Sequence, residues 1–186
     1  QFLSDPKFLQ AITSASFAYV VMAFLMTATP ISMHIIHKLS LDKLGVVMQF
    51  HVLAMFLPSL VTGNLIKKFG YSKIMYVGVI FYIFTILMSF FEPSYLNYFA
   101  GLFFLGIGWN FLFVSGTSLL VTTYKPEEKF KAQGFNDLVV FSLTAVSSLS
   151  AGILISITSW KIVNLLCIPF LILIIFSIIN AKKKSK

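Results

Sequence analysis

The chain contains little charge and almost no cysteine. Only 11% of its 186 residues are charged, six are acidic, and every basic residue is a lysine. The single cysteine, Cys167, can form neither a disulfide bond within the chain nor a thiolate cluster, and its apolar surroundings predict a packing role. The glycine-rich loop that binds nucleotide phosphates is also missing, so ATP-driven chemistry is not supported. We expect no cofactor and no metal.

Long apolar stretches dominate what is present. Hydrophobic residues make up 58% of the chain and the mean hydropathy is +0.92, more than a soluble core of this size requires. At a rise of about 1.5 Å per residue, most of the stretches can cross a hydrocarbon layer of about 30 Å. We therefore predict an all-α membrane protein in which residues 1–186 form one bundle of six transmembrane helices. The predicted helices cover residues 8–36, 46–66, 74–91, 96–122, 138–158 and 160–179.

The lysines fall on alternate sides of these stretches. Only Lys38, Lys43 and Lys161 lie on one side, and the positive-inside rule places the other, lysine-rich side in the cytosol. We expect a plasma (bacterial inner) membrane with both termini cytoplasmic, and this topology accounts for the net charge of +8 without a nucleic-acid partner. The first residue is glutamine, so we also expect the chain to be a piece of a longer protein. The lysine-rich side holds Lys7, Lys67, Lys68, Lys73, Lys125, Lys129, Lys131, Lys182, Lys183, Lys184 and Lys186.

The two halves of the chain resemble each other weakly. A shift of 89 positions aligns small and apolar residues at two helix ends, the first facing the cytosol and the second facing outside. Such a pattern is typical of a three-helix unit repeated with inverted topology, which is found in transporters rather than in enzymes. The aligned residues are Gly63, Leu65, Ile66 and Gly70-Tyr71 with Gly152, Leu154, Ile155 and Ser159-Trp160.

Polar side chains are distributed unevenly among the stretches. The third stretch of each triplet, 74–91 and 160–179, is almost purely apolar and is predicted to face lipid. The other four carry polar residues at membrane depth and should line an interior path, because polar groups in hydrocarbon need partners or water. Glycines 101, 106, 108 and 116 should let neighbouring helices approach closely. The predicted substrate cavity consists of His51, Met55, Ser59, Trp109, Asn110 and Asn136, and Pro58 and Thr62 share the helical face of the first three.

For several of these residues the sequence leaves two roles open. His51 could carry a coupling proton or simply bond a neighbouring helix. Asn110 could contact substrate or bridge two helices. Asp137 could take part in gating, or could complement the dipole in the first turn of its helix.

One loop resembles a sequence motif of a known family. Residues 63–73 read Gly-Asn-Leu-Ile-Lys-Lys-Phe-Gly-Tyr-Ser-Lys and resemble the major facilitator superfamily motif G-x-L-x-D-R-x-G-R-[KR]. Lys67 replaces the usual aspartate, as is common in the second copy of the motif, so the chain resembles the C-terminal half of such a transporter, helices seven to twelve. Segments 51–59, 105–110 and 133–137 are similar to a bacterial branch of drug and metabolite transporters, some of which are associated with riboflavin uptake. The matching motif positions are Gly63, Leu65, Lys68, Gly70 and Lys73.

The resemblance implies a fold and a mechanism. In the family, helices seven, eight, ten and eleven line the cavity while nine and twelve lie outside, which agrees with the polarity pattern. The implied function is secondary transport of a small organic solute by alternating access, coupled to protons or another ion. The partner would be the N-terminal six-helix half. Gly63, Lys68, Gly70, Lys73 and Asp137 are the predicted gating residues, with Gly70 a left-handed helix cap.

Other classes of membrane protein remain as alternatives to a transporter. A six-helix channel or a stand-alone oligomeric membrane protein would show the same apolar stretches. An intramembrane serine protease would need a histidine on the last stretch to pair with Ser115-Gly116, and that stretch has none. The repeated loops of a mitochondrial carrier are absent. We therefore expect a transporter and not an enzyme.

Overall fold

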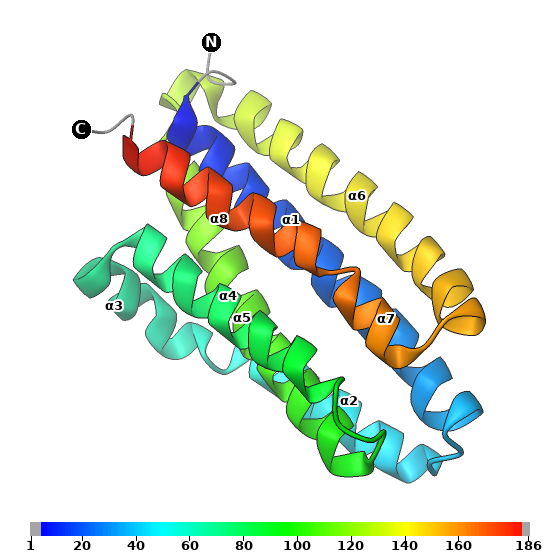
Figure 1. Ribbon diagram of the computed structural model, residues 1–186. Coiled ribbons are helices and arrows are strands. Elements are labelled where there is room, and N and C mark those ends of the chain that lie inside the picture. Colours follow the sequence, from blue (N-terminus) through cyan, green and yellow to red (C-terminus); the bar gives the residue numbers. More distant parts are fainter. Residues whose placement is uncertain (1–4, 184–186) are drawn as a thin grey trace.

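A computed structural model describes residues 5–183, and this part of the chain consists of helices joined by short connections (Figure 1). The predicted all-α class is confirmed. Six helical segments within residues 5–183 are long and apolar enough to cross a membrane: Pro6–Ile36, Leu41–Phe69, Tyr71–Met88, Tyr95–Leu120, Pro126–Ile157 and Trp160–Lys183. The individual elements are α1 (Pro6–Pro30), η2 (Ile31–Ile36), α2 (Leu41–Phe56), α3 (Ser59–Phe69), α4 (Tyr71–Met88), α5 (Tyr95–Leu120), η3 (Pro126–Glu128), α6 (Lys129–Ile157), α7 (Trp160–Leu165) and α8 (Ile168–Lys183).

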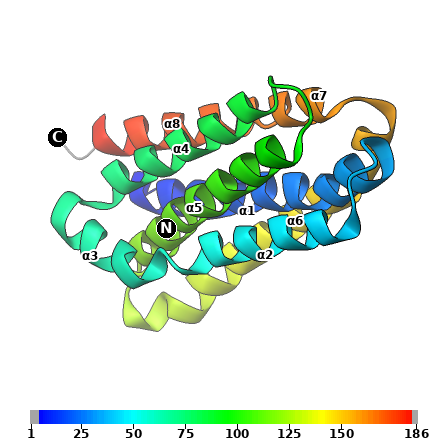
Figure 2. The same ribbon diagram turned by 90° about the horizontal axis from the view of Figure 1, so that it is seen from below.

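Helices α1 and α5 form the centre of the bundle. They pack against each other, and both are more buried than the other spans (Figures 1 and 2). Helices α2 and α4 pack on α5, whereas α6 and α8 pack on α1. Each central helix is the first span of one three-span repeat, and it is covered by the second and third spans of the other repeat. This exchange is the packing expected of two inverted three-helix repeats.

Glycines on α5 permit the close helix contacts that the sequence predicted. A Cβ atom at Gly106 would lie 2.7 Å from the carbonyl oxygen of His51 on α2. At Gly116 it would lie 2.8 Å from the carbonyl oxygen of Ala11 on α1. Both partners are backbone atoms that cannot move aside cheaply, so α5 contacts both neighbours through positions without side chains. Gly101 differs, because its nearest outside atom would lie at 3.5 Å, an ordinary contact.

The ends and interruptions of the helices differ from the predicted ranges. The second span begins at Leu41 and is interrupted at Leu57-Pro58, because proline lacks the N–H that would continue the helix. The sixth span is interrupted between α7 and α8, just before Pro169. In the first span the α-helix becomes a π-helix directly after Pro30.

Helix α6 gives the largest difference in length. It begins at Lys129, well before the predicted start at residue 138. Asn136 and Asp137 consequently lie inside the helix, and the interpretation of Asp137 as a first-turn partner of the helix dipole is wrong. The error has a physical cause. Hydrophobicity reports where a helix enters the membrane, and a helix can continue beyond that depth with polar residues.

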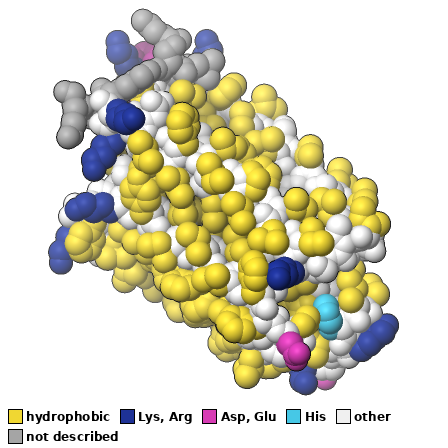
Figure 3. Space-filling model, viewed as in Figure 1, with side chains coloured by type: hydrophobic (Ala, Val, Ile, Leu, Met, Phe, Trp, Pro, Cys, Tyr) yellow, Lys and Arg dark blue, Asp and Glu magenta, His cyan; other side chains and the backbone are white. Residues whose placement is uncertain are grey.

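The charged side chains gather at the two ends of the bundle (Figure 3). The end that carries both termini also carries most of the lysines, and the face that Figure 3 shows is largely apolar between the two ends. This distribution is the one expected of a protein with a membrane around its middle. The described lysines of the first end are Lys7, Lys67, Lys68, Lys73, Lys125, Lys129, Lys131, Lys182 and Lys183; Lys184 and Lys186 lie outside the described residues.

Candidate functional site

Asn110 braces the break in the second span. Its Nδ2 donates to the carbonyl oxygen of Met55 at 2.7 Å and to Oγ of Ser59 at 2.6 Å. Its Oδ1 accepts a hydrogen bond of 2.7 Å from Oγ1 of Thr62. The side chain is fully buried, and its three bonds reach both sides of Pro58. One buried amide thus supplies partners to a span whose regular hydrogen bonding is interrupted.

His51 lies one turn of α2 before Met55 and also faces α5. Its Nδ1 is 2.8 Å from the carbonyl oxygen of Leu102, which can only accept, so Nδ1 carries a proton. The other ring nitrogen, Nε2, is buried and has no hydrogen-bond partner among the described residues. The histidine therefore contacts a neighbouring helix and retains one unused ring nitrogen.

Trp109 faces a different direction from Asn110 and joins a cluster of rings. The ring stacks on Phe113 with centroids 5.0 Å apart and an interplanar angle of 13°. Tyr19 meets Trp109 edge-on at 5.2 Å and Phe113 edge-on at 4.9 Å. Phe56 lies 5.9 Å from Trp109, and Phe141 lies 6.3 Å from Tyr19. We call these five residues the aromatic cluster.

The aromatic cluster draws on four helices. Tyr19 belongs to α1, Phe56 to α2, Trp109 and Phe113 to α5, and Phe141 to α6. These are the four spans that were predicted to line an interior path. Apart from Trp109, these residues were not predicted from the sequence. The available signal was an aromatic residue near the middle of each polar span, but 16% of the chain is aromatic, so that signal is weak.

The structure separates the predicted cavity residues into three places. His51, Met55, Ser59 and Asn110 come together between α2, α3 and α5. Trp109 points into the aromatic cluster. Asn136 lies far from both, in a pocket of about 350 Å³ near the lysine-rich end of α5 and α6, lined also by Asp137, Gln133 and Thr117. There Nδ2 of Asn136 donates to Oδ1 of Asp137 at 3.1 Å.

The motif loop is a single-residue connection between α3 and α4. Gly70 has φ +85° and ψ 156°, so it has the positive φ expected of the cap, but its ψ lies outside the left-handed helical region. Lys68 is exposed, with Nζ 5.2 Å from the ring centroid of Phe69. Lys73 lines a pocket of about 370 Å³ together with Lys7 and Lys182. A Cβ atom at Gly63 would meet no atom of the described residues within 4 Å, so their packing gives no reason for a glycine there.

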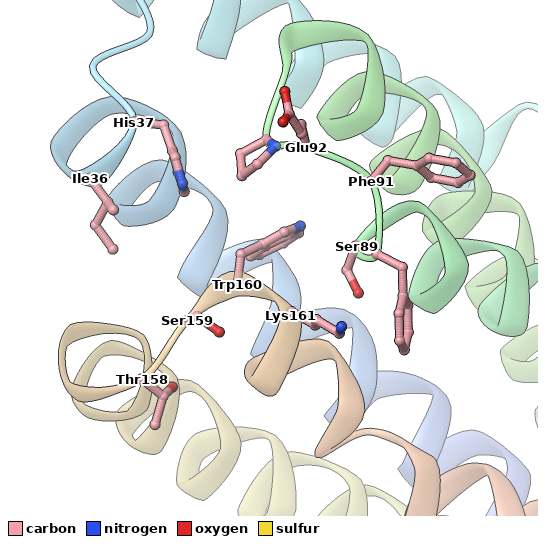
Figure 4. A pocket seen from close by; sticks show the side chains of 11 residues that line it. Ile36, His37, Ser89, Phe91, Glu92, Thr158, Ser159, Trp160 and Lys161 are labelled. Carbon is pink, nitrogen blue, oxygen red and sulfur yellow. The ribbon is translucent and has the colours of Figure 1, made fainter.

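A further pocket of about 310 Å³ opens at the end of the bundle opposite the termini (Figure 4). Its walls come from η2, from the α4–α5 connection and from the start of α7, with Trp160 between His37 and Ser89. Lys161 lies here with Nζ 4.3 Å from the ring centroid of Phe90.

Behind this pocket a buried network ties the π-helix to α5. Oγ of Ser32 and the hydroxyl of Tyr98 are 2.5 Å apart. Nδ1 of His37 is 3.0 Å from that hydroxyl and 2.8 Å from the carbonyl oxygen of Ser32. The ring of Tyr98 also packs on Trp160 at 5.0 Å. Three elements that meet at this end are therefore joined through one tyrosine.

Comparisons with known proteins agree with the fold. The sequence pattern of the Major Facilitator Superfamily matches residues 11–185. The riboflavin transporter RfnT of Brucella anthropi is 36% identical over 179 residues, covering 96% of this chain and 45% of RfnT. The uncharacterized MFS-type transporters YdeG and YddS of Bacillus subtilis are 32% and 30% identical over 79% and 80% of this chain. No solved structure matches.

The chain spans less than half the length of these relatives, since it covers 45% of RfnT and 34% of each Bacillus protein. The match nevertheless extends over nearly all of the described helices, and all three relatives are named as transporters. The chain belongs to the major facilitator superfamily.

Proposed function

We propose that this chain is the C-terminal six-helix half of a secondary transporter, which moves a small organic solute by alternating access and is coupled to protons or another ion. The family and the coverage of the relatives support the role of a half. Two of the polar spans, 41–69 and 126–157, are the least buried in the bundle. Their exposed side chains include Phe56, Leu60, Phe141 and Leu149, which need either lipid or another helix against them.

The observation that carries the proposal is the arrangement of the four polar spans. Each contributes a ring to the aromatic cluster, whereas α4 and α8 contribute none. A second six-helix bundle placed against the spans 41–69 and 126–157 would enclose the cluster between the halves. Secondary transporters bind their solutes near the midplane between repeats, and this is where we place the solute.

Two positions support contact with a second half: Gly63 is exposed and Gly152 is half-buried. Gly63 on α3 and Gly152 on α6 correspond under the internal repeat. Among the residues of 5–183, a Cβ atom at Gly63 would meet no atom within 4 Å, and one at Gly152 would meet a single atom, of Ile31, at 3.9 Å. Glycine lets backbones approach closely, and a helix of the other half would use this freedom. We further propose a latch against that half, formed by Lys68, Gly70, Lys73 and Asp137. Both termini would lie on the cytosolic side of a plasma membrane.

The name of RfnT makes riboflavin the first solute to test. The complete protein would be reconstituted in liposomes and an inward proton gradient imposed. We expect riboflavin to accumulate, and a protonophore to abolish accumulation while leaving exchange of preloaded solute intact. Downhill flux at channel rates, insensitive to any gradient, would favour the alternative of a channel. Failure to accumulate or exchange any member of a panel of small solutes would contradict secondary transport.

A further inference from the structure

We infer that the aromatic cluster, Tyr19, Phe56, Trp109, Phe113 and Phe141, is a stacking surface for a flat aromatic ring of the transported solute. The inference rests on the proposed function and adds the chemical class of the solute and the residues that select it. The first support is position. Four of the rings lie near the middle of their spans, and Phe113 lies about one turn from Trp109 on the same helix, so the cluster sits at the depth at which a transported solute would bind.

The exposure of the rings is graded. Trp109 at the base is only 3% exposed, Tyr19 and Phe113 are half-buried, and Phe56 and Phe141 on the flanking helices are 59% and 60% exposed. The cluster therefore has a packed floor and two accessible edges. A planar ring can lie on such a surface by offset stacking or edge-to-face contact, and both geometries already occur among the five rings.

The second support is an unused hydrogen-bond donor. Nε1 of Trp109 is buried and has no partner among the described residues, although a buried indole usually finds an acceptor. The neighbouring rings offer none, apart from the hydroxyl of Tyr19. An acceptor on the solute would satisfy this donor once a ring beside it turns aside, because Nε1 itself has no accessible surface in the described structure. The expected solute is therefore an aromatic heterocycle that carries ring carbonyls or ring nitrogens, rather than a sugar or an amino acid. Sites for small molecules commonly combine apolar surface with few polar groups.

A set of related probes separates the ring from the rest of such a molecule. Riboflavin has an aromatic heterocycle and a ribityl chain, lumichrome has a related ring system without that chain, and ribitol is the chain alone. If the cluster binds the ring, lumichrome should bind the complete purified transporter within about tenfold of riboflavin, as judged from quenching of its fluorescence. Ribitol should not compete with either. Competition by ribitol and not by lumichrome would overturn the inference.

Matched variants locate the binding. Phe113→Leu removes a half-buried ring of the cluster from α5. Phe104→Leu removes a ring from the same helix that packs instead on Phe81 and Phe84 of α4. We expect Phe113→Leu to weaken the binding of riboflavin and lumichrome about tenfold, in the range of a lost stacking contact, and Phe104→Leu to change it less than twofold. Trp109→Phe keeps a ring and removes the N–H, so we expect it to weaken lumichrome binding as well. Equal effects of Phe113→Leu and Phe104→Leu would contradict the inference.

The same liposomes distinguish this inference from the proposed function. Gradient-driven uptake of riboflavin, lumichrome, ribitol and alanine would be measured for the unmodified transporter and for Phe113→Leu. Uptake of ribitol or alanine alone, unchanged by Phe113→Leu, would refute the stacking surface and leave secondary transport standing. Binding of lumichrome without uptake of any solute would support the surface and refute transport of these solutes. An unmodified transporter that binds neither riboflavin nor lumichrome would overturn the inference.

Discussion

At the scale of single residues, several buried polar side chains of the spans join neighbouring helices. Asn110, Thr62 and His51 all bond groups on other elements, and all three are buried. The sequence could predict that polar groups at membrane depth need partners. It could not say which, because the partners of Asn110 are a backbone carbonyl and two hydroxyls on either side of a proline that interrupts the span. The aromatic cluster escaped prediction for a similar reason, since ring contacts depend on how helices are rotated.

Replacing Asn110 by alanine should destabilise the bundle. The change removes three hydrogen bonds and leaves Thr62 and the carbonyl of Met55 with fewer partners. Removing one partner of a buried hydrogen bond costs about 1–3 kcal/mol. We expect a clearly lower melting temperature in detergent for Asn110→Ala and no change for the exposed control Asn64→Ala. If the melting temperature stays constant while solute affinity falls, Asn110 acts on the solute and not as a brace.

Replacing Gly106 by alanine tests the close contact between α5 and α2. The new methyl group would lie 2.7 Å from a backbone oxygen, so a helix must move. Overpacking of this kind typically costs about 1–3 kcal/mol. Gly101→Ala is the matched control on the same helix, because its methyl group would fall at an ordinary distance of 3.5 Å. Thermal unfolding should be earlier for the first variant only, and equal melting curves would show that the helices are less tightly packed than described.

At the scale of elements, hydropathy predicted the six spans better than their ends. Apolar runs identified every span, because burial in lipid demands them. The early start of α6 at Lys129 was missed because its first residues are polar. The interruption at Pro58 and the π-helix after Pro30 depend on how freed backbone groups are satisfied by neighbouring helices. Hydropathy contains no information on that point.

The α3–α4 connection should tolerate only glycine at position 70. With φ at +85° and ψ at 156°, a residue with a Cβ atom would be strained by about 1–3 kcal/mol. We expect Gly70→Ala to lower thermal stability. Gly134→Ala in α6 is the control, since its Cβ atom meets nothing within 4 Å and alanine favours helix. A stable Gly70→Ala variant would mean that the connection adopts another conformation.

At the scale of the whole molecule, the bundle has a charge-rich end and two exposed spans. The lysine distribution predicts which end lies in the cytosol, and it can be tested with two matched cysteines in a Cys167→Ser background. Glu92 and Glu127 are both exposed and lie at opposite ends of the bundle. In intact cells an impermeant thiol reagent should label Glu92→Cys and not Glu127→Cys, and permeabilised cells should label both. The reverse pattern would invert the topology.

The central claim is that these six helices form one half of a transporter and complete a solute site only with another half. It is tested most directly by comparing solute uptake into liposomes by the complete protein and by residues 1–186 alone, at equal protein density. The complete protein should accumulate riboflavin against its gradient. The isolated chain should self-associate through its exposed spans and accumulate none. Concentrative uptake by a monomer of the isolated chain would contradict the account.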